Sequence, residues 1–284
     1  MSFIVIGSGI SGVNAALTLL ERGKEVELWD VGITDDFKDS QLSNFKSNVE
    51  FKKSLTKPYE FFYGENLHGI STPQSNSLFS LPENRNYYLK KDSEFWNFNQ
   101  NKFDLVTSLS SGGLANGWGA NSIPFNDDDI ADWPMSISYL NKDYKKVYSR
   151  INVTKCSDEL SNYYDEFGSQ ENIKLEQSDQ YILNNYNRRK KYFTEKNIFL
   201  GKARLAISNS IDDTNYNNYL SRPIWVPNER IYNPIQTLNK CKKYKKFKYL
   251  DNRFIKYLIV NGGQISGINY FDTRTKKIIN EKIN

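Results

Sequence analysis

The first thirty residues carry the pattern that most constrains the fold. Residues 3–12 read Phe-Ile-Val-Ile-Gly-Ser-Gly-Ile-Ser-Gly, an apolar run that leads directly into G-x-G-x-x-G. A helical pattern follows over 13–22, and a second apolar-rich run over 25–28 ends in Trp29-Asp30. This order of strand, glycine turn, helix, strand and acid is typical of a β-α-β unit that binds an adenine dinucleotide.

Each part of this fingerprint has a physical task. Gly7 lets the chain leave the strand in a tight turn, Gly9 leaves room for a pyrophosphate, and Gly12 lets the helix pack closely on the sheet. The free amides at the positive end of the helix favour an anion. Asp30 lies 18 residues after Gly12, where its carboxylate can accept from ribose hydroxyls. The predicted cofactor-binding residues of this unit are Gly7, Ser8, Gly9, Ile10, Ser11, Gly12 and Asp30.

A second glycine-rich segment spans 110–120 and reads Ser-Ser-Gly-Gly-Leu-Ala-Asn-Gly-Trp-Gly-Ala. Its glycines suit a backbone that passes close to a flat ring, since they carry no side chain and tolerate unusual backbone angles. A glycine-rich turn between a strand and a helix is the alternative reading. The residues we expect at the ring are Gly112, Gly113, Asn116 and Gly117.

Length and composition limit the class of protein. The 284 residues are enough for about two domains, and the net charge of +5 is modest. The basic run over 242–248 is expected to be a solvated helix or turn, and no nucleic-acid partner is predicted from it. Cys156 and Cys241 fit neither a disulfide framework nor a zinc pattern, and no metal site is predicted. With no apolar run long enough to span a bilayer and no signal peptide, we expect a cytoplasmic protein.

The remaining patterns outline the organisation of the chain. The weakly patterned stretch 33–100 is expected to be an excursion that covers a ligand. Helices are predicted from Ser136 to Ile151 and over 158–167. Strand patterns from Arg253 to Ile279 predict a β-meander near the C-terminus, and the apolar run at the N-terminus predicts a core strand. We expect a dinucleotide-binding domain over 1–150 and a partial substrate or cap region over 151–284.

The two glycine motifs together resemble the glucose–methanol–choline (GMC) family of flavin oxidoreductases. More narrowly, the chain is similar to members found in bacterial surface-polysaccharide gene clusters. The resemblance includes the acidic run at 127–129, Asp-Trp-Pro at 132–134, and the segments 201–206 and 231–234. Family members usually have Glu where this chain has Asp30, which is one methylene shorter but can still accept from ribose.

The resemblance implies an α/β fold with a Rossmann-like FAD-binding domain and an incomplete β-meander and substrate region. It implies FAD as cofactor, with its ADP half over 7–12 and Asp30 and its flavin ring against the second glycine segment. The implied reaction is oxidation of a CH-OH group in an alcohol, sugar or polyol derivative, by hydride transfer to flavin N5. An NAD(P)-dependent dehydrogenase and a non-catalytic dinucleotide-binding fragment are the alternatives.

The resemblance provides no catalytic residue. Family members are about twice this long and carry their histidine base in the C-terminal part, whereas the single histidine here, His68, matches no such position. The chain therefore looks truncated, and we expect no turnover from it alone, with a separate C-terminal half as a partner. Tyr87 and Lys91 have the Y-x-x-x-K spacing of short-chain dehydrogenases, which chance explains in a chain rich in both residues.

Overall fold

The computed structural model describes residues 2–34, 53–63, 107–164, 167–171, 175, 177–207 and 231–283. The chain divides into two compact units. The first comprises 1–117, 223–226 and 233–284, and the second comprises 118–222 and 227–232. The chain thus passes between the units more than once, and its last fifty residues belong with its first hundred. The functional division expected at residue 150, into a cofactor domain and a cap, stays a prediction.

A parallel sheet lies at the centre of the first unit. Its strands are β1 (Ser2–Ile6), β2 (Glu25–Trp29) and β5 (Phe247–Leu250), in the order β1-β2-β5. In the register Val5 pairs with Leu28, and Leu28 with Tyr249. Helix α1 (Ile10–Glu21) connects β1 to β2, as parallel neighbours require. The predicted α/β class is confirmed by this parallel sheet with its helical connection.

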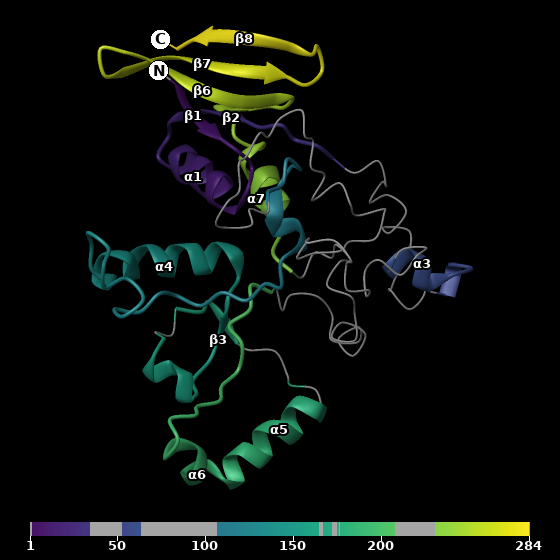
Figure 1. Ribbon diagram of the computed structural model, residues 1–284, viewed down its shortest axis with the longest axis vertical. Helices are drawn as coiled ribbons and strands as arrows, with labels where there is room; N and C mark the ends of the chain where they lie inside the picture. Colours follow the sequence, from purple (N-terminus) through teal and green to yellow (C-terminus); the bar gives the residue numbers. More distant parts are fainter. Residues whose placement is uncertain are drawn as a thin grey trace, which may run out of the picture. The chain divides into compact units, whose positions relative to one another are not determined.

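Two helices cover one face of this sheet (Figure 1). Helix α1 packs beside α7 (Pro234–Cys241), which begins with Asn233 accepting the backbone N–H of Ile235 at 2.9 Å. Pro234 suits the first helical turn because no amide is needed there. The buried side chains of this layer come from both helices and from β2: Val13, Ala16, Leu17, Leu20, Val26, Leu28, Leu238 and Cys241. Helix α7 is not among the helices predicted from the sequence.

The predicted β-meander is confirmed and covers the opposite face (Figure 1). It consists of β6 (Arg253–Asn261), β7 (Gln264–Asp272) and β8 (Lys277–Lys282), paired antiparallel in that order. Trp29 is 1% exposed and meets Tyr270 edge to face, with ring centroids 5.5 Å apart. The first unit therefore has three layers: helices, parallel sheet and meander.

Strand β1 differs from the expected core strand. The sheet order places it at an edge, and among the described residues it hydrogen-bonds to a strand on one side only. Phe3 is 43% exposed and Ile6 is 48% exposed, although both belong to an apolar run. Apolar character along β1 indicated burial on both faces, but the strand lies at the edge of the sheet, and within the described part of the chain no strand pairs with its outer side.

The second unit contains the predicted helix α4 (Ile137–Ile151), which follows Ser136. The helix expected over 158–167 is wrong in extent, because the described residues of this span form only a 3₁₀ turn, η3 (Glu159–Asn162). There the Asp158 carboxylate accepts the Leu160 N–H at 3.0 Å, and the Asp158 N–H donates to Ser161 Oγ at 3.1 Å. These reciprocal bonds cap a single turn.

Short elements complete the two units. In the second unit β3 (Thr154–Lys155) pairs in parallel with β4 (Gln170–Glu171), and α5 (Gln177–Arg188) precedes α6 (Lys190–Thr194). Most of the excursion expected over 33–100 lies outside the described residues, apart from a short stretch that includes α3 (Pro58–Tyr63). None of the described helices is long and apolar enough to cross a membrane.

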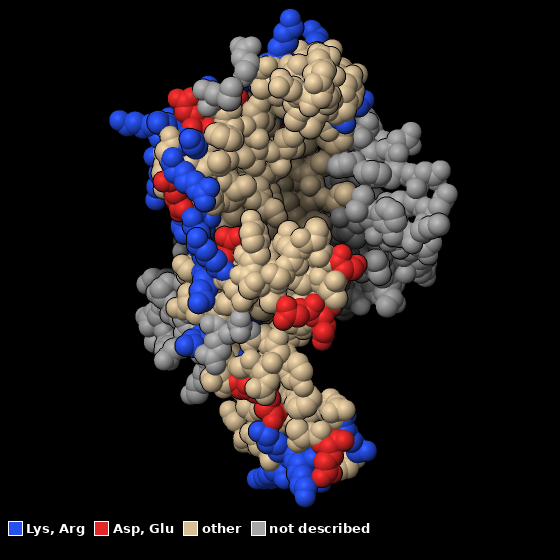
Figure 2. Space-filling view, turned by 90° about the vertical axis from the view of Figure 1, so that its left-hand side faces the viewer, with Lys and Arg blue, Asp and Glu red and all other residues tan. Residues whose placement is uncertain are grey.

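The basic run over 242–248 forms a turn and the start of β5. The expectation of a helix or turn is therefore wrong for Phe247 and Lys248, which lie in the parallel strand. Lys248 pairs with Glu27 at 3.1 Å, and Lys246 donates to the Gly23 carbonyl at 3.0 Å. Figure 2 shows exposed Lys and Arg side chains with Asp and Glu among them on the face it draws. Mixed charges of this kind are expected for a solvated surface.

Candidate functional site

The fingerprint turn has the geometry that its glycines predict. Gly7 has a φ of +88° and donates its N–H to the Trp29 carbonyl at 2.8 Å, which fixes the turn to the end of β2. A Cβ on Gly12 would lie 1.9 Å from the carbonyl oxygen of Gly7. Side chains are therefore excluded at both positions, by backbone conformation at Gly7 and by close helix packing at Gly12.

Gly9 is different because its α-carbon faces open space. Its φ is −61°, which any residue can adopt, and a Cβ there would meet no described atom within 4 Å. Gly9 is also the N-cap of α1 and supplies no side-chain cap. The amides of Ile10 and Ser11 consequently have no intrahelical acceptor. A position without a side chain, beside amides that have no acceptor within the helix, fits the close approach of an anionic group.

Asp30 lies at the carboxyl end of β2 and is 8% exposed. Its carboxylate accepts hydrogen bonds from the hydroxyls of Ser8 and Tyr249, the latter at 3.0 Å. Burial raises the pKa of Asp30, and the bonds from these hydroxyls and from the amides of Ser8 and Val31 oppose that rise. Ser8 of the fingerprint turn and Tyr249 of β5 therefore hold the Asp30 carboxylate in place.

The structure brings the second glycine segment against the fingerprint turn. Ser111 donates its N–H to the Ile33 carbonyl at 2.8 Å, and the Gly112 N–H donates to Ser8 Oγ at 2.8 Å. A Cβ on Gly113, where φ is +63°, would lie 3.5 Å from the α-carbon of Gly9. Residues a hundred positions apart thus meet at the carboxyl ends of β1 and β2, the edge at which open α/β sheets bind ligands.

The Asn116 side chain stabilises the second glycine segment by hydrogen bonds to residues of the same segment. It lies in η2 (Gly113–Gly117), and its Nδ2 donates to the Ser111 carbonyl at 2.7 Å and to Ser110 Oγ at 3.1 Å. A Cβ on Gly112 would lie 2.6 Å from Asn116 Oδ1. The side-chain amide is therefore used to hold its own loop, and a contact of Asn116 or Gly117 with a flavin ring stays a prediction.

Sequence reasoning missed one residue of this site, Tyr249 on β5. Its hydroxyl lies 3.0 Å from Asp30 Oδ2 and 3.3 Å from Ser111 Oγ. The signal available was alternation, since Phe247 and Tyr249 are apolar on one face of β5 while Lys248 between them is charged. The dense lysines around this strand obscured the pattern.

The described residues offer no further catalytic constellation. His68, Tyr87 and Lys91 lie outside the described residues. In the acidic run, Asp129 Oδ2 accepts the Asn126 N–H at 2.9 Å, which closes a turn. No group of three or more His, Cys, Asp or Glu in the described part of the chain could hold a metal ion.

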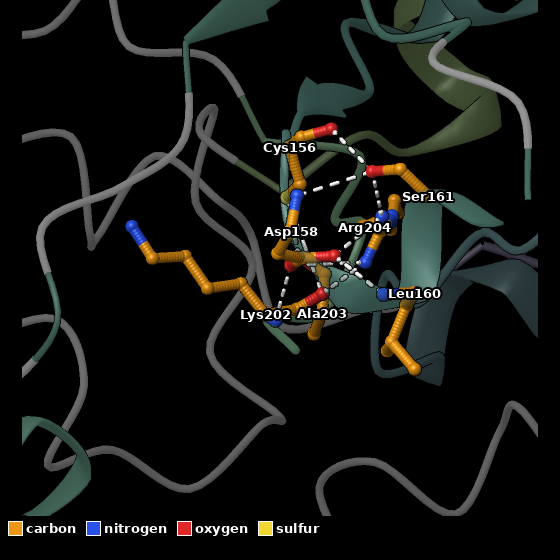
Figure 3. A network of polar contacts seen from close by, with 7 residues as sticks. All are labelled: Cys156, Asp158, Leu160, Ser161, Lys202, Ala203 and Arg204. Atoms are coloured by element: carbon orange, nitrogen blue, oxygen red, sulfur yellow. Dashed lines mark hydrogen bonds and ion pairs between the residues drawn. The ribbon is translucent and has the colours of Figure 1, made fainter. Parts of the chain in front are cut away.

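The segment 201–206 of the second unit has a structural role (Figure 3). Arg204 is 6% exposed and its guanidinium donates to both carboxylate oxygens of Asp158, at 3.0 Å and 3.3 Å. The Lys202 N–H donates to the same carboxylate at 2.8 Å, and a Cβ on Gly201 would lie 2.7 Å from it. This network ties the segment to η3, so its residues are explained by packing and hydrogen bonding within the unit.

Comparisons with known proteins give structural likenesses only. No protein-family model matches the chain, and no curated protein matches it. An FAD-dependent oxidoreductase from Chaetomium thermophilum is similar over 100% of this chain and 44% of its own, with 15% identity and a TM-score of 0.49. Quinol fumarate reductase FrdA of E. coli is similar over 99% of this chain and 32% of its own, with 9% identity and a TM-score of 0.33. The chain thus spans less than half the length of either protein, and likenesses this distant assign it neither family nor function.

Proposed function

We propose that the first unit is an FAD-binding domain of an oxidoreductase. The observation that carries this proposal is the contact between the two glycine segments. The amide of Gly112 bonds to Ser8, and the α-carbons of Gly113 and Gly9 lie side by side. A nicotinamide dinucleotide shares the fingerprint but is not expected to need the second glycine segment, whereas backbone without side chains suits the close approach of a flavin ring.

The residues present fit an adenine dinucleotide. A Cβ on Gly9 would meet no described atom within 4 Å, and the amides of Ile10 and Ser11 have no acceptor within the helix, which suits the pyrophosphate. Asp30 stands at the strand end where ribose is bound in such folds. Gly113 presents backbone without a side chain next to Gly9, Gly112 precedes it, and Gly117 ends the same 3₁₀ turn. These residues bind and orient the cofactor.

The chemistry that FAD would supply is acceptance of a hydride, which we propose is taken from a CH-OH carbon of an alcohol, sugar or polyol derivative. Support for this substrate class comes from the resemblance of both motifs to the GMC family, and the same resemblance supports a role in surface-polysaccharide synthesis. No described residue is assigned as the base. Deprotonation of the hydroxyl would then need a group outside the described residues or a separate C-terminal half.

The test is an equilibrium titration of the purified chain with FAD, NAD⁺ and NADP⁺, followed by flavin fluorescence or by calorimetry. We expect binding of FAD in preference to both nicotinamide dinucleotides. Gly9→Glu should abolish it, because the side chain would fill the open space and add a negative charge beside the phosphates. Gln264→Glu, which adds the same charge in the meander, is the control. Preference for NAD⁺, or FAD binding that Gly9→Glu leaves unchanged, would refute the proposal.

A further inference from the structure

A half-buried tyrosine hydroxyl joins the three segments of the candidate site. Tyr249 reaches from β5 to Asp30 after β2 and to Ser111 in the second glycine segment, at 3.0 Å and 3.3 Å. Its ring packs with the apolar side chains of the helix-covered face. A parallel connection runs through Ser8, which donates to Asp30 and accepts the Gly112 N–H. Two hydrogen-bonded arms therefore start at one carboxylate and end on neighbouring residues of the glycine segment.

We propose that Tyr249 is a positioning residue of the dinucleotide site, which holds the Asp30 carboxylate and the second glycine segment in the arrangement that binds cofactor. This inference rests on the proposed function of the first unit. Tyr249 itself need not touch the ligand. Its effect is exerted through Asp30 on the fingerprint side and through Ser111 on the glycine-segment side.

The direction of the hydrogen bonds follows from donor and acceptor chemistry. An ionised carboxylate only accepts, so the single phenol hydrogen of Tyr249 is donated to Asp30. The phenol oxygen then accepts from the hydroxyl of Ser111. Burial and the nearby Asp30 charge raise the pKa of Tyr249, so the phenol keeps this hydrogen at neutral pH. Replacement by Phe removes both bonds while retaining the ring.

The Tyr249 hydroxyl lies beside Gly32, where the absence of a side chain leaves room for it. Gly32 has a φ of +69°, and a Cβ on it would lie 2.6 Å from the Tyr249 hydroxyl oxygen and 3.2 Å from Cβ of Asp251. A side chain at position 32 would therefore push the hydroxyl away from Asp30. Gly32 thus provides the space that the Tyr249 hydroxyl occupies.

The charges around the carboxylate define the expected pH effect. Besides Tyr249, the groups that face this region are Asp251 after β5 and Lys242, whose ammonium lies 5.0 Å from the Tyr249 ring centroid. Arg253 donates its N–H to the Asp30 carbonyl while its guanidinium lies over Trp29, 4.1 Å from the ring centroid. Among these groups, the Tyr249 hydroxyl is one whose bond lowers the pKa of Asp30. Its loss should therefore raise that pKa further.

The first experiment measures FAD affinity of the full chain between pH 5 and 8 for the wild type and Tyr249→Phe. Loss of a hydrogen bond to a charged group should weaken binding about 10-fold at pH 8. The pH below which affinity falls should also move upward in the variant, a shift that a purely structural role would not produce. Tyr270→Phe is the matched control, since it removes a phenol whose hydroxyl bonds to Glu281 in the meander, at 3.2 Å.

The second experiment is a double-mutant cycle with Gly32→Ala. In the wild-type background Gly32→Ala should weaken FAD binding, because its Cβ displaces the hydroxyl. In the Tyr249→Phe background it should weaken binding less, because the hydroxyl atom that it would strike is absent, while the strain of the positive φ and the 3.2 Å contact with Asp251 Cβ are the same in both backgrounds. Effects that simply add, or a Tyr249→Phe variant with wild-type affinity and pH midpoint, would overturn the inference. A wild-type chain that does not bind FAD would instead refute the proposed function on which the inference rests.

Discussion

Gly12→Ala should destabilise the protein even without a cofactor. The added Cβ would lie 1.9 Å from the Gly7 carbonyl oxygen and 3.1 Å from its carbonyl carbon. Both are backbone atoms, and the Gly7 amide is fixed by its 2.8 Å bond to the Trp29 carbonyl. The overlap between this Cβ and the Gly7 carbonyl can therefore be removed only if α1 moves away from the turn or the turn loses its hydrogen bond to β2.

The size of the effect follows from the overlap. To reach 3.0 Å, the shortest separation that real Cβ atoms show, helix and turn must separate by 3.0 − 1.9 = 1.1 Å. Overpacking of a tight core typically costs about 1–3 kcal/mol, and overlap with backbone belongs at the upper end of this range. The better helix propensity of Ala returns at most ~1 kcal/mol. We expect a net loss of about 2 kcal/mol in the free energy of unfolding.

Urea unfolding of the cofactor-free chain, followed by circular dichroism, measures this loss. Gly9→Ala is the matched control, because its Cβ meets no described atom within 4 Å and its φ is −61°. That variant should keep the wild-type stability to within about 0.5 kcal/mol while it binds FAD at least 10-fold more weakly. A Gly12→Ala protein as stable as the wild type would refute the close packing of α1 on the turn.

Three other predictions concern the second unit, pH and catalysis. Arg204→Met should lower the free energy of unfolding by about 3 kcal/mol, because it leaves the Asp158 carboxylate without its buried partner. Lys190→Met, which removes a half-exposed lysine that pairs with Glu159, is the control. Equal urea unfolding curves for the two variants would contradict this prediction. The pKa of Asp30 is raised above 3.8 in the folded state, so at pH values between 3.8 and the folded-state pKa the folded chain binds more protons than the unfolded chain. The contribution of Asp30 to the free energy of unfolding therefore falls as the pH rises through this range. The difference in urea midpoint between the wild type and Asp30→Asn should therefore shift in favour of the wild type as the pH is lowered from 7 toward 4, and a constant difference would count against a buried Asp30. Because the resemblance to the GMC family provides no base in this chain, the purified chain with added FAD should show no alcohol oxidation with a dye acceptor. Turnover near ~1 per second would contradict this and show that a residue of the chain serves as the base.

The sequence was most informative where spacing alone dictates geometry. The fingerprint over 3–12 and the acid at Asp30 predicted β1, α1 and β2, because a glycine turn between an apolar strand and an amphipathic helix has few other solutions. The meander was equally readable from alternating strands around Gly262 and Gly263, both of which have positive φ. The meeting of the two glycine segments was expected from the resemblance to a flavoprotein family and not from spacing.

Features that depend on distant partners were not readable. Phe247 and Tyr249 belong to a parallel strand only because β2 lies beside them, and the lysines around them indicate a solvated turn. The network of Tyr249, Asp30 and Ser111 joins residues from three parts of the chain, so no local pattern reveals it. The exposed outer side of β1 is likewise a matter of strand order, which the apolar content of the strand does not indicate.

The central claim is that the turn between β1 and α1 binds the pyrophosphate of FAD. Backbone amide resonances of the labelled chain, recorded during titration with FAD, test this residue by residue. The signals of Gly9, Ile10 and Ser11 should show the largest shifts, those of Gly262 and Gly263 in the meander turn should stay in place, and Gly9→Glu should abolish the response. Saturation with FAD that leaves the signals of Gly9–Ser11 unmoved while other signals shift would contradict the account.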